Sequence, residues 1–245
     1  MIKRYIVAGA LALAAFGVAA PAPAATVAPN FFFGGAQAGG QCSIPAATVQ
    51  SLQDKLSQVA GSPSPAYNGG LFAPNRMWSA VVDRSGRLCS VIVFGDAWPG
   101  SRAIAIAKAF TGNAFSNDAL ALSTTMLYTP TQPGGSLYGL NESNLFRTDA
   151  YGPADAVGKI NGGIITFGGG FALYQNGKVI GGLGVSGDTS CADHVIGYRM
   201  RRLASLDQIP GGAGGDNISY PAPGAALSGF QQPHCSAGDV APAAI

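Results

Sequence analysis

The chain has 245 residues, of which 47% are hydrophobic and only 11% are charged, so it can form a core and is not a disordered polar segment. There are 14 Lys and Arg against 12 Asp and Glu, and two of the basic residues, Lys3 and Arg4, lie in a predicted leader. The remaining chain is therefore neutral, which excludes the strongly basic surface typical of nucleic-acid-binding proteins and of proteins held on anionic membranes.

The first 24 residues have the pattern of a secretory signal peptide. Lys3 and Arg4 precede an apolar run over 6–20, and Ala22-Pro23-Ala24 supplies the small residues of a cleavage site. The apolar run is shorter than the ~20 residues that a membrane-spanning helix needs, so cleavage after Ala24 is favoured over an uncleaved anchor. We expect a periplasmic or secreted protein with no membrane span after cleavage.

After the leader, residues 25–43 are predicted to form an extended lead-in and residues 44–60 a helix. The apolar residues of this helix recur at spacings of three and four: Val49, Leu52, Leu56 and Val59. Such spacing places them on one face of the helix, toward a core.

Two apolar runs, 77–82 and 88–94, flank a turn at 83–86 and are predicted to pair as a β-hairpin. A helix of about 15 residues follows. We expect Ser101 to cap its start and Phe115 to lie at its end.

A second helical piece is predicted over 118–127, and a long loop rich in Gly, Pro, Asn and Ser over 129–162. The next apolar run, 164–175, is interrupted by three glycines. It is joined to a return strand over 178–185 by Asn176-Gly177, which is the strongest short signal for a hairpin.

The last helix is predicted over 190–206. The residues expected to face the core are Val195, Ile196 and Met200, and those expected to face solvent are Arg199, Arg201 and Arg202. Residues 207–245 are predicted to be a Gly/Pro/Ala-rich C-terminal extension that wraps the surface. Two hairpins with helices around them indicate one α+β domain over 44–206, with an antiparallel sheet.

Four cysteines follow the leader: Cys42, Cys89, Cys191 and Cys235. An even number in an exported chain favours two disulfides over free thiols. Three pairings are open, of which a Cys42–Cys235 bridge would tie the ends of the ordered region together. The absence of Cys-x-x-Cys argues against a dithiol oxidoreductase and a zinc ribbon.

The segment 182–187 matches the dinucleotide pattern Gly-x-Gly-x-x-Gly, and Asp207 lies twenty residues after Gly187. The match is weak, because this pattern requires a strand–helix–strand unit and these glycines lie largely within the return strand of a hairpin. Close packing of a helix or a ligand against the strand explains the glycines better.

A Ser/His/Asp hydrolase has little support. The only histidines are His194 and His234, and Asp193 is adjacent to His194 in a predicted helix, where neighbouring residues do not face one another. No convincing pair of acid and base groups is present.

The helix after the first hairpin carries Ile104, Lys108, Thr111 and Phe115 on one face, at spacings of four, three and four. A Lys that extends to solvent and a Thr bonded back to its own helix explain this face most simply. The alternative is a ligand pocket in which the ammonium meets a carboxylate.

Several short blocks occur in the order found in one known family. They are Val-Val-Asp-Arg-Ser-Gly at 81–86, Asp-Ala-Trp-Pro-Gly-Ser at 96–101, Ala-Ile-Ala-Lys-Ala-Phe-Thr at 105–111, the glycines 168–170, the Asn176-Gly177 hairpin, and 180–187 followed by Asp193. Over about 45–205 they resemble the GlcG/HbpS family of haem-binding proteins. The resemblance implies a profilin-like antiparallel sheet flanked by helices, assembly into homo-oligomers, and a haem pocket in exported members, some of which degrade haem.

The resemblance also implies site residues. Thr111 is the counterpart of a threonine described as an iron ligand, and His194 is the competing ligand. Lys108 and Arg102 could meet haem propionates, and Phe115 lies on the same helix. Further candidates for the iron are Tyr128, Tyr138 and Tyr151. The chain departs from the family in its four cysteines, its 129–162 insertion, its C-terminal extension, and a Gly-Gly-Gly-Phe-Ala segment that lacks the family's proline.

Three functions are therefore open. The first is an exported haem-binding protein that sequesters, delivers or helps to degrade haem. The second is a periplasmic accessory protein of a dehydrogenase or uptake system, which would bind a protein partner and no haem. The third is an enzyme acting on a small hydroxy or oxo acid, in which Lys108 would hold the carboxylate.

Overall fold

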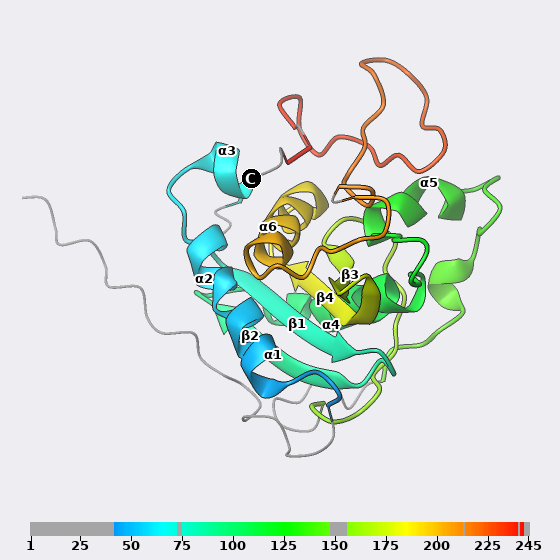
Figure 1. Cartoon of the computed structure of the whole chain (residues 1–245). Helices are drawn as coiled ribbons and strands as arrows, with labels where there is room; N and C mark the ends of the chain where they lie inside the picture. The colour runs from blue at the N-terminus through cyan, green and yellow to red at the C-terminus, as the bar shows by residue number, and fades with distance from the viewer. Residues whose placement is uncertain (1–41, 73–74, 148–155, 213, 240, 243–245) are drawn as a thin grey trace, which may run out of the picture.

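The computed structural model describes residues 42–72, 75–147, 156–212, 214–239 and 241–242 (Figure 1). The predicted leader, nearly all of the predicted lead-in, and Tyr151 lie outside these ranges. Within the described residues, no helix is both long enough and apolar enough to cross a membrane.

The centre of the fold is a four-stranded antiparallel sheet. Its strands are β1 (Met77–Asp83), β2 (Leu88–Phe94), β3 (Gly170–Gln175) and β4 (Lys178–Ser186), in the spatial order β2-β1-β4-β3. Both predicted hairpins are confirmed, and they join edge to edge through pairing of β1 with β4. The α+β prediction is also confirmed.

The predicted strand over 164–167 is absent from the sheet, and β3 begins only at Gly170. The backbone N–H of Ile165 donates to the side-chain oxygen of Thr111 at 3.0 Å rather than to a neighbouring strand. A side chain on a helix thus takes the place of a strand partner, which explains why an apolar, β-branched run is not a strand here.

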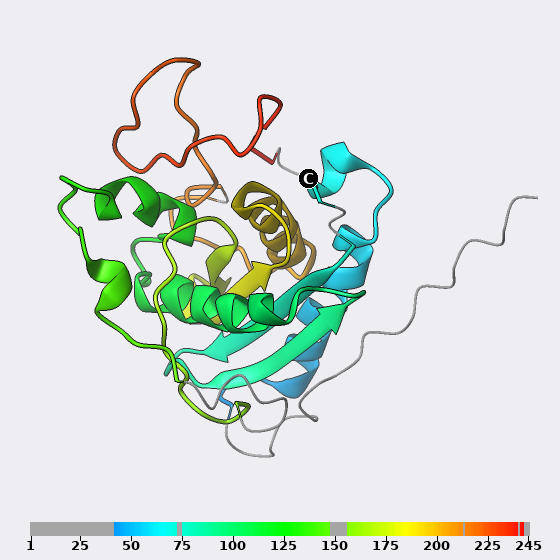
Figure 2. The same cartoon turned by 180° about the vertical axis from the view of Figure 1, so that it is seen from behind.

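Helix α4 (Pro99–Ala114) covers one face of the sheet, as Figure 2 shows. A Cβ at Gly184 would collide with the carbonyl oxygen of Ala105, and one at Gly182 with that of Ala109. Gly182 and Gly184 therefore permit close packing of α4 on β4, as expected, and the dinucleotide interpretation has no structural context.

The start of α4 differs from the prediction. The helix begins at Pro99, with Trp98 at the N-cap, and no side chain caps it. Ser101 is therefore inside the first turn, and its predicted role as the cap is wrong. Proline suits this first position because its fixed φ matches the helix and it has no N–H to leave unpaired.

Helices α1 (Ala46–Gln53), α2 (Lys55–Ala60) and α6 (Ser190–Leu203) cover the other face (Figure 1). The predicted helix over 44–60 is thus split at Asp54. Its four apolar residues are buried as predicted, and they pack with Ile196 and Met200 of α6 in one core cluster.

The segment between α4 and β3 is mostly irregular. It contains a 3-10 turn over Thr124–Leu127, helix α5 (Tyr128–Thr131) and a second 3-10 turn over Leu140–Glu142. The helix predicted over 118–127 is reduced to its last turn. The Asn117 side chain accepts bonds from the N–H groups of residues 119 and 120, and this local bonding competes with helix formation.

The arginines of α6 also differ from the prediction, which placed three of them in solvent. Arg201 is fully buried and forms two bonds of 2.6 Å with the carboxylate of Asp216 and one of 3.0 Å with the carbonyl of Ala172. Arg199 is 8% exposed, and Arg202 pairs with Asp207 at 2.9 Å. The C-terminal extension supplies Asp216 and Asp207, so it converts one side of α6 into an interior surface.

Two disulfides are present, Cys42–Cys89 and Cys191–Cys235. The prediction of two bridges is confirmed, while a Cys42–Cys235 bridge is excluded. Each bridge ties a segment next to the core domain to its nearest element: Cys42 to β2 and Cys235 to the start of α6. Since all four sulfurs are oxidised, none is available as a thiolate ligand for a metal.

Candidate functional site

Thr111 lies on α4 and is fully buried. Its hydroxyl donates to the carbonyl of Ala107 at 2.7 Å and accepts from the N–H of Ile165 at 3.0 Å. The simpler interpretation, a threonine bonded back to its own helix, describes this side chain, and it also anchors the segment before β3. Its role as an iron ligand stays a prediction.

Lys108 is also fully buried, and its ammonium lies 2.7 Å from a carboxylate oxygen of Asp193, which is 2% exposed. It also donates to the carbonyl of Val185 at 3.1 Å and lies 5.0 Å from the centre of the Phe167 ring. The structure therefore brings Lys108 to α6, where a carboxylate of this chain occupies it. Contact of Lys108 with a haem propionate stays a prediction.

Burial sets the proton affinities of this pair. It lowers the pKa of Lys108, although the Asp193 carboxylate opposes the shift. Burial also raises the pKa of Asp193 to about 6, against the effects of Lys108 and of the hydrogen bond from the Asp188 N–H. Asp193 thus serves Lys108 and the backbone rather than the adjacent His194, as expected for neighbours on a helix.

His194 is fully buried on α6, with its ring centre 4.5 Å from that of Phe171. Neither ring nitrogen makes a hydrogen bond of good geometry within the described residues, although the Asn217 side chain lies near the ring. Burial and the positive charges of Arg201 and Lys108 lower the pKa of His194 well below its usual value, although the Asn217 side chain opposes this. The imidazole is therefore neutral, which is the form that binds a metal.

The remaining predicted site residues lie along α4. Arg102, the fourth residue of α4, is buried, and this burial lowers the pKa of Arg102. Phe115 is the half-buried residue that ends the helix. Because α4 and α6 cover opposite faces of the sheet, Thr111 and His194 lie on different faces, and Lys108 contacts Asp193 of α6.

A shallow apolar pocket of about 190 Å³ lies on the outer side of α4, next to Thr111. Residues from α4, the insertion and the segment before β3 line it: Ala103, Ile104, Ala107, Asn141, Asn144, Leu145, Phe146, Gly163, Ile164 and Ile165. Its volume is below the ~300–1,000 Å³ usual for small-molecule sites. It can therefore hold only part of a large ligand.

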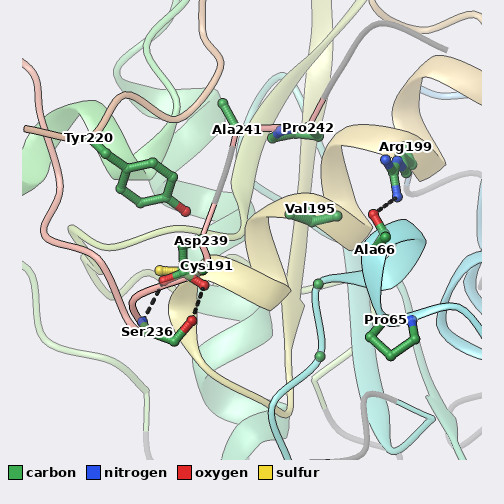
Figure 3. Close-up of a pocket in the computed structure, with 13 residues that line it drawn as sticks. Pro65, Ala66, Cys191, Val195, Arg199, Tyr220, Ser236, Asp239, Ala241 and Pro242 are labelled. Carbon is green, nitrogen blue, oxygen red and sulfur yellow. Dashed lines mark hydrogen bonds between the residues drawn. The ribbon is translucent and has the colours of Figure 1, made fainter. Parts of the chain in front are cut away.

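A larger pocket of about 380 Å³, here called the tail pocket, lies between α3 (Pro65–Asn68), α6 and the C-terminal extension (Figure 3). Its lining consists of Pro65, Ala66, Gly69, Gly70, Cys191, Val195, Arg199, Tyr220, Ser236, Gly238, Asp239, Ala241 and Pro242. No sequence pattern predicts this pocket, because the extension has no periodic pattern and its residues meet α6 through long-range contacts.

The polar groups of the tail pocket come from two sides. On one side, the Arg199 guanidinium stacks 4.3 Å from the centre of the Tyr67 ring and donates to the carbonyl of Ala66 at 3.4 Å. On the other side lie Tyr220 and Asp239. The Tyr220 hydroxyl is buried and has no partner within the described residues, and burial, with help from Asp239, raises its pKa.

Two known proteins are similar to this chain in sequence. A Citrobacter freundii protein described as an uncharacterized 15.0 kDa protein in the dhaT-dhaS intergenic region is 34% identical over 117 residues, which are 48% of this chain and 68% of that protein. Corrinoid adenosyltransferase PduO of Salmonella typhimurium is 36% identical over 108 residues, which are 44% of this chain but only 26% of that enzyme.

Two solved structures agree in fold. Klebsiella pneumoniae protein ORFY is 25% identical with a TM-score of 0.50, covering 66% of this chain and 90% of that one. A complex of PduOC with haem is 23% identical with a TM-score of 0.51, covering 68% and 99%. The family model described as haem degrading protein HbpS-like matches residues 73–199, and the chain therefore belongs to the HbpS-like family.

Proposed function

We propose that this protein is exported and binds haem, which it sequesters or delivers. Membership of a family described as haem degrading supports the proposal, as does the solved complex of PduOC with haem, which shares the fold. Two disulfides favour a place outside the cytoplasm, and so does the leader pattern of residues 1–24. Assembly into a homo-oligomer, implied by the resemblance, is part of the same proposal.

The observation that carries the proposal is the state of His194. A fully buried, neutral imidazole whose nitrogens make no hydrogen bond of good geometry, with only the Asn217 side chain near them, is costly, and such groups in native proteins require an explanation. Histidine is a common ligand of haem iron, whereas a hydroxyl is a poor one. Since the Thr111 hydroxyl already donates one bond and accepts another, His194 fits the role of iron ligand better.

Access to His194 sets a condition on binding. The imidazole is enclosed between Phe171 and the extension near Asn217, so haem reaches it only if the extension moves. Bound haem would supply a redox-active iron. Of the two predicted propionate partners, Lys108 is the one that contacts α6 beside His194, whereas Arg102 lies on α4.

Absorption spectra of haemin bound to matched variants test this assignment. We expect His194→Ala to lose or shift the Soret band of the wild-type protein. Thr111→Val removes the hydroxyl with little change in shape, and we expect it to keep the band. Loss of the band in Thr111→Val, with His194→Ala unchanged, would contradict the choice of His194.

A further inference from the structure

We propose that the tail pocket is a second binding site, for a small organic carboxylate with a hydrogen-bonding group at the far end of an apolar body. This inference does not depend on haem binding. Of the lining residues, those of the extension lie beyond residue 199, where the match to the family model ends. The site therefore combines residues of the matched family region, such as Arg199, with residues of the extension that lie outside that match.

Arg199 provides the reason to expect an anion. Its side chain is 8% exposed, yet its contacts are one long bond to the Ala66 carbonyl and the face of Tyr67, and its Nε has no partner within the described residues. A guanidinium stays charged in proteins, even though burial lowers the pKa of Arg199. Buried charges are normally paired, and within the described residues no carboxylate pairs with this one, so an anion in the pocket would complete its pairing.

The neighbouring arginines of α6 sharpen the contrast. Arg201 has a carboxylate partner in Asp216 at 2.6 Å, and Arg202 has one in Asp207 at 2.9 Å. No carboxylate of the described residues pairs with Arg199. Arg199 is thus the one of these three arginines that lines a pocket, and it is also the one for which no carboxylate of the described residues serves as counter-ion.

The opposite side of the pocket offers a donor and an acceptor. The Tyr220 hydroxyl has no partner within the part of the chain that the structure describes. Its raised pKa keeps it protonated, so it can donate. The Asp239 carboxylate is fixed by bonds from the N–H groups of Cys235 and Ser236 and from the Ser236 hydroxyl. A hydroxyl on the ligand could therefore accept from Tyr220 and donate to Asp239.

The middle of the pocket is apolar, and its size suits a small molecule. Figure 3 shows Val195 between Arg199 and the Tyr220 side, with Pro65 and Pro242 also at the wall. The volume of about 380 Å³ lies in the ~300–1,000 Å³ range of small-molecule sites. The polar groups at two ends and the apolar centre together define the ligand class.

Calorimetric titration of the mature protein with three related probes tests the proposal. The first probe, para-hydroxyphenylacetate, has all three features; para-hydroxyphenylacetamide lacks the charge, and phenylacetate lacks the hydroxyl. We expect saturable binding of the first probe, about tenfold or more weaker binding of the amide, and several-fold weaker binding of phenylacetate, as losses of a charged and of a neutral hydrogen bond. Absence of saturable binding, or equal affinity for acid and amide, would overturn the proposal.

Variants then assign the groups. Arg199→Gln should bind the acid no better than the amide, and Tyr220→Phe should bind the first probe and phenylacetate equally. Arg202→Gln, a control on the same helix outside the pocket, should behave as wild type. An acid preference retained in Arg199→Gln would refute the assignment, and if that variant does not fold, the wild-type acid–amide comparison and Tyr220→Phe decide. Displacement of the probe by equimolar haemin that persists in His194→Ala would assign the pocket to haem and overturn a separate site, whereas displacement lost in His194→Ala would reflect movement of the extension on haem binding.

Discussion

The ammonium of Lys108 lies 2.7 Å from the carboxylate of Asp193, and this buried pair joins the helices that cover the two faces of the sheet. The ammonium also bonds to the carbonyl of Val185 near the end of β4. One ion pair thus links α4, β4 and α6 at the end of the sheet.

Breaking this pair from one side should be strongly destabilising. Lys108→Met leaves the Asp193 carboxylate buried without its cation, with only the bond from the Asp188 N–H in place, and we expect a loss of about 3–5 kcal/mol in the free energy of unfolding. The double variant Lys108→Met/Asp193→Leu removes both charges and should lose less than the single variant. Urea denaturation measures both, and a double variant less stable than Lys108→Met would contradict this account of the pair.

The lowered pKa of His194 predicts a pH dependence of stability. The unfolded imidazole binds a proton below its usual pKa of about 6.5, while the folded one stays neutral. The stability of the fold therefore does not depend on His194 protonation above that pKa. Below it, the free energy of unfolding falls by about 1.4 kcal/mol per pH unit.

The variant His194→Leu isolates this effect. Between pH 7.5 and pH 5, wild type should lose stability relative to the variant, as measured by urea denaturation at each pH. Parallel pH profiles of the two proteins would show that His194 is not held neutral in the fold.

The disulfide Cys191–Cys235 should hold the extension on α6. It closes a sequence separation of 44 residues, for which loop entropy predicts a contribution of about 4 kcal/mol. We expect Cys191→Ser/Cys235→Ser to lose stability and to be cleaved within 207–242 by a protease that leaves wild type intact. The matched control, Cys42→Ser/Cys89→Ser, opens a similar separation of 47 residues but should leave the extension protected. Equal protection in both variants would mean that the ion pair of Arg201 with Asp216 is sufficient to hold it.

Close packing of α4 on β4 depends on Gly184. The methyl group of Gly184→Ala would meet the Ala105 carbonyl, and we expect a loss of about 1–3 kcal/mol from overpacking. Gly100→Ala is the control: Gly100 lies in the first turn of α4 with nothing within 4 Å of an added Cβ, so it should be neutral or slightly stabilising. Thermal unfolding compares the two, and an equal effect would rule out close approach as the reason for Gly184.

Local patterns predicted the elements of this fold, and long-range contacts explain what they missed. Asn176-Gly177 and the apolar spacing of α1 and α2 act within a few residues, and both predictions were correct in outline. The burial of Arg201 depends on Asp216, which reaches α6 only when the extension folds back. The tail pocket is of the same kind, since Arg199 and Tyr220 lie on opposite sides of it and share no local sequence pattern.

The candidate site was harder to predict because the polar side chains expected to bind a ligand make hydrogen bonds and an ion pair within the protein itself. Lys108 and Thr111 do share a face of α4, but Asp193 and Ile165 bind them there. His194 was named without its most informative property, two buried nitrogens that make no hydrogen bond of good geometry, since a hydrogen-bonding environment cannot be read from a helix pattern.

Titration of the mature wild-type protein with haemin, followed by absorption, tests the central claim most directly. The account predicts a sharp Soret band that saturates at one haem per chain and is absent or shifted in His194→Ala. A broad change that grows linearly with added haemin would contradict haem binding, and a protein partner or a small acid would then be the ligand to pursue.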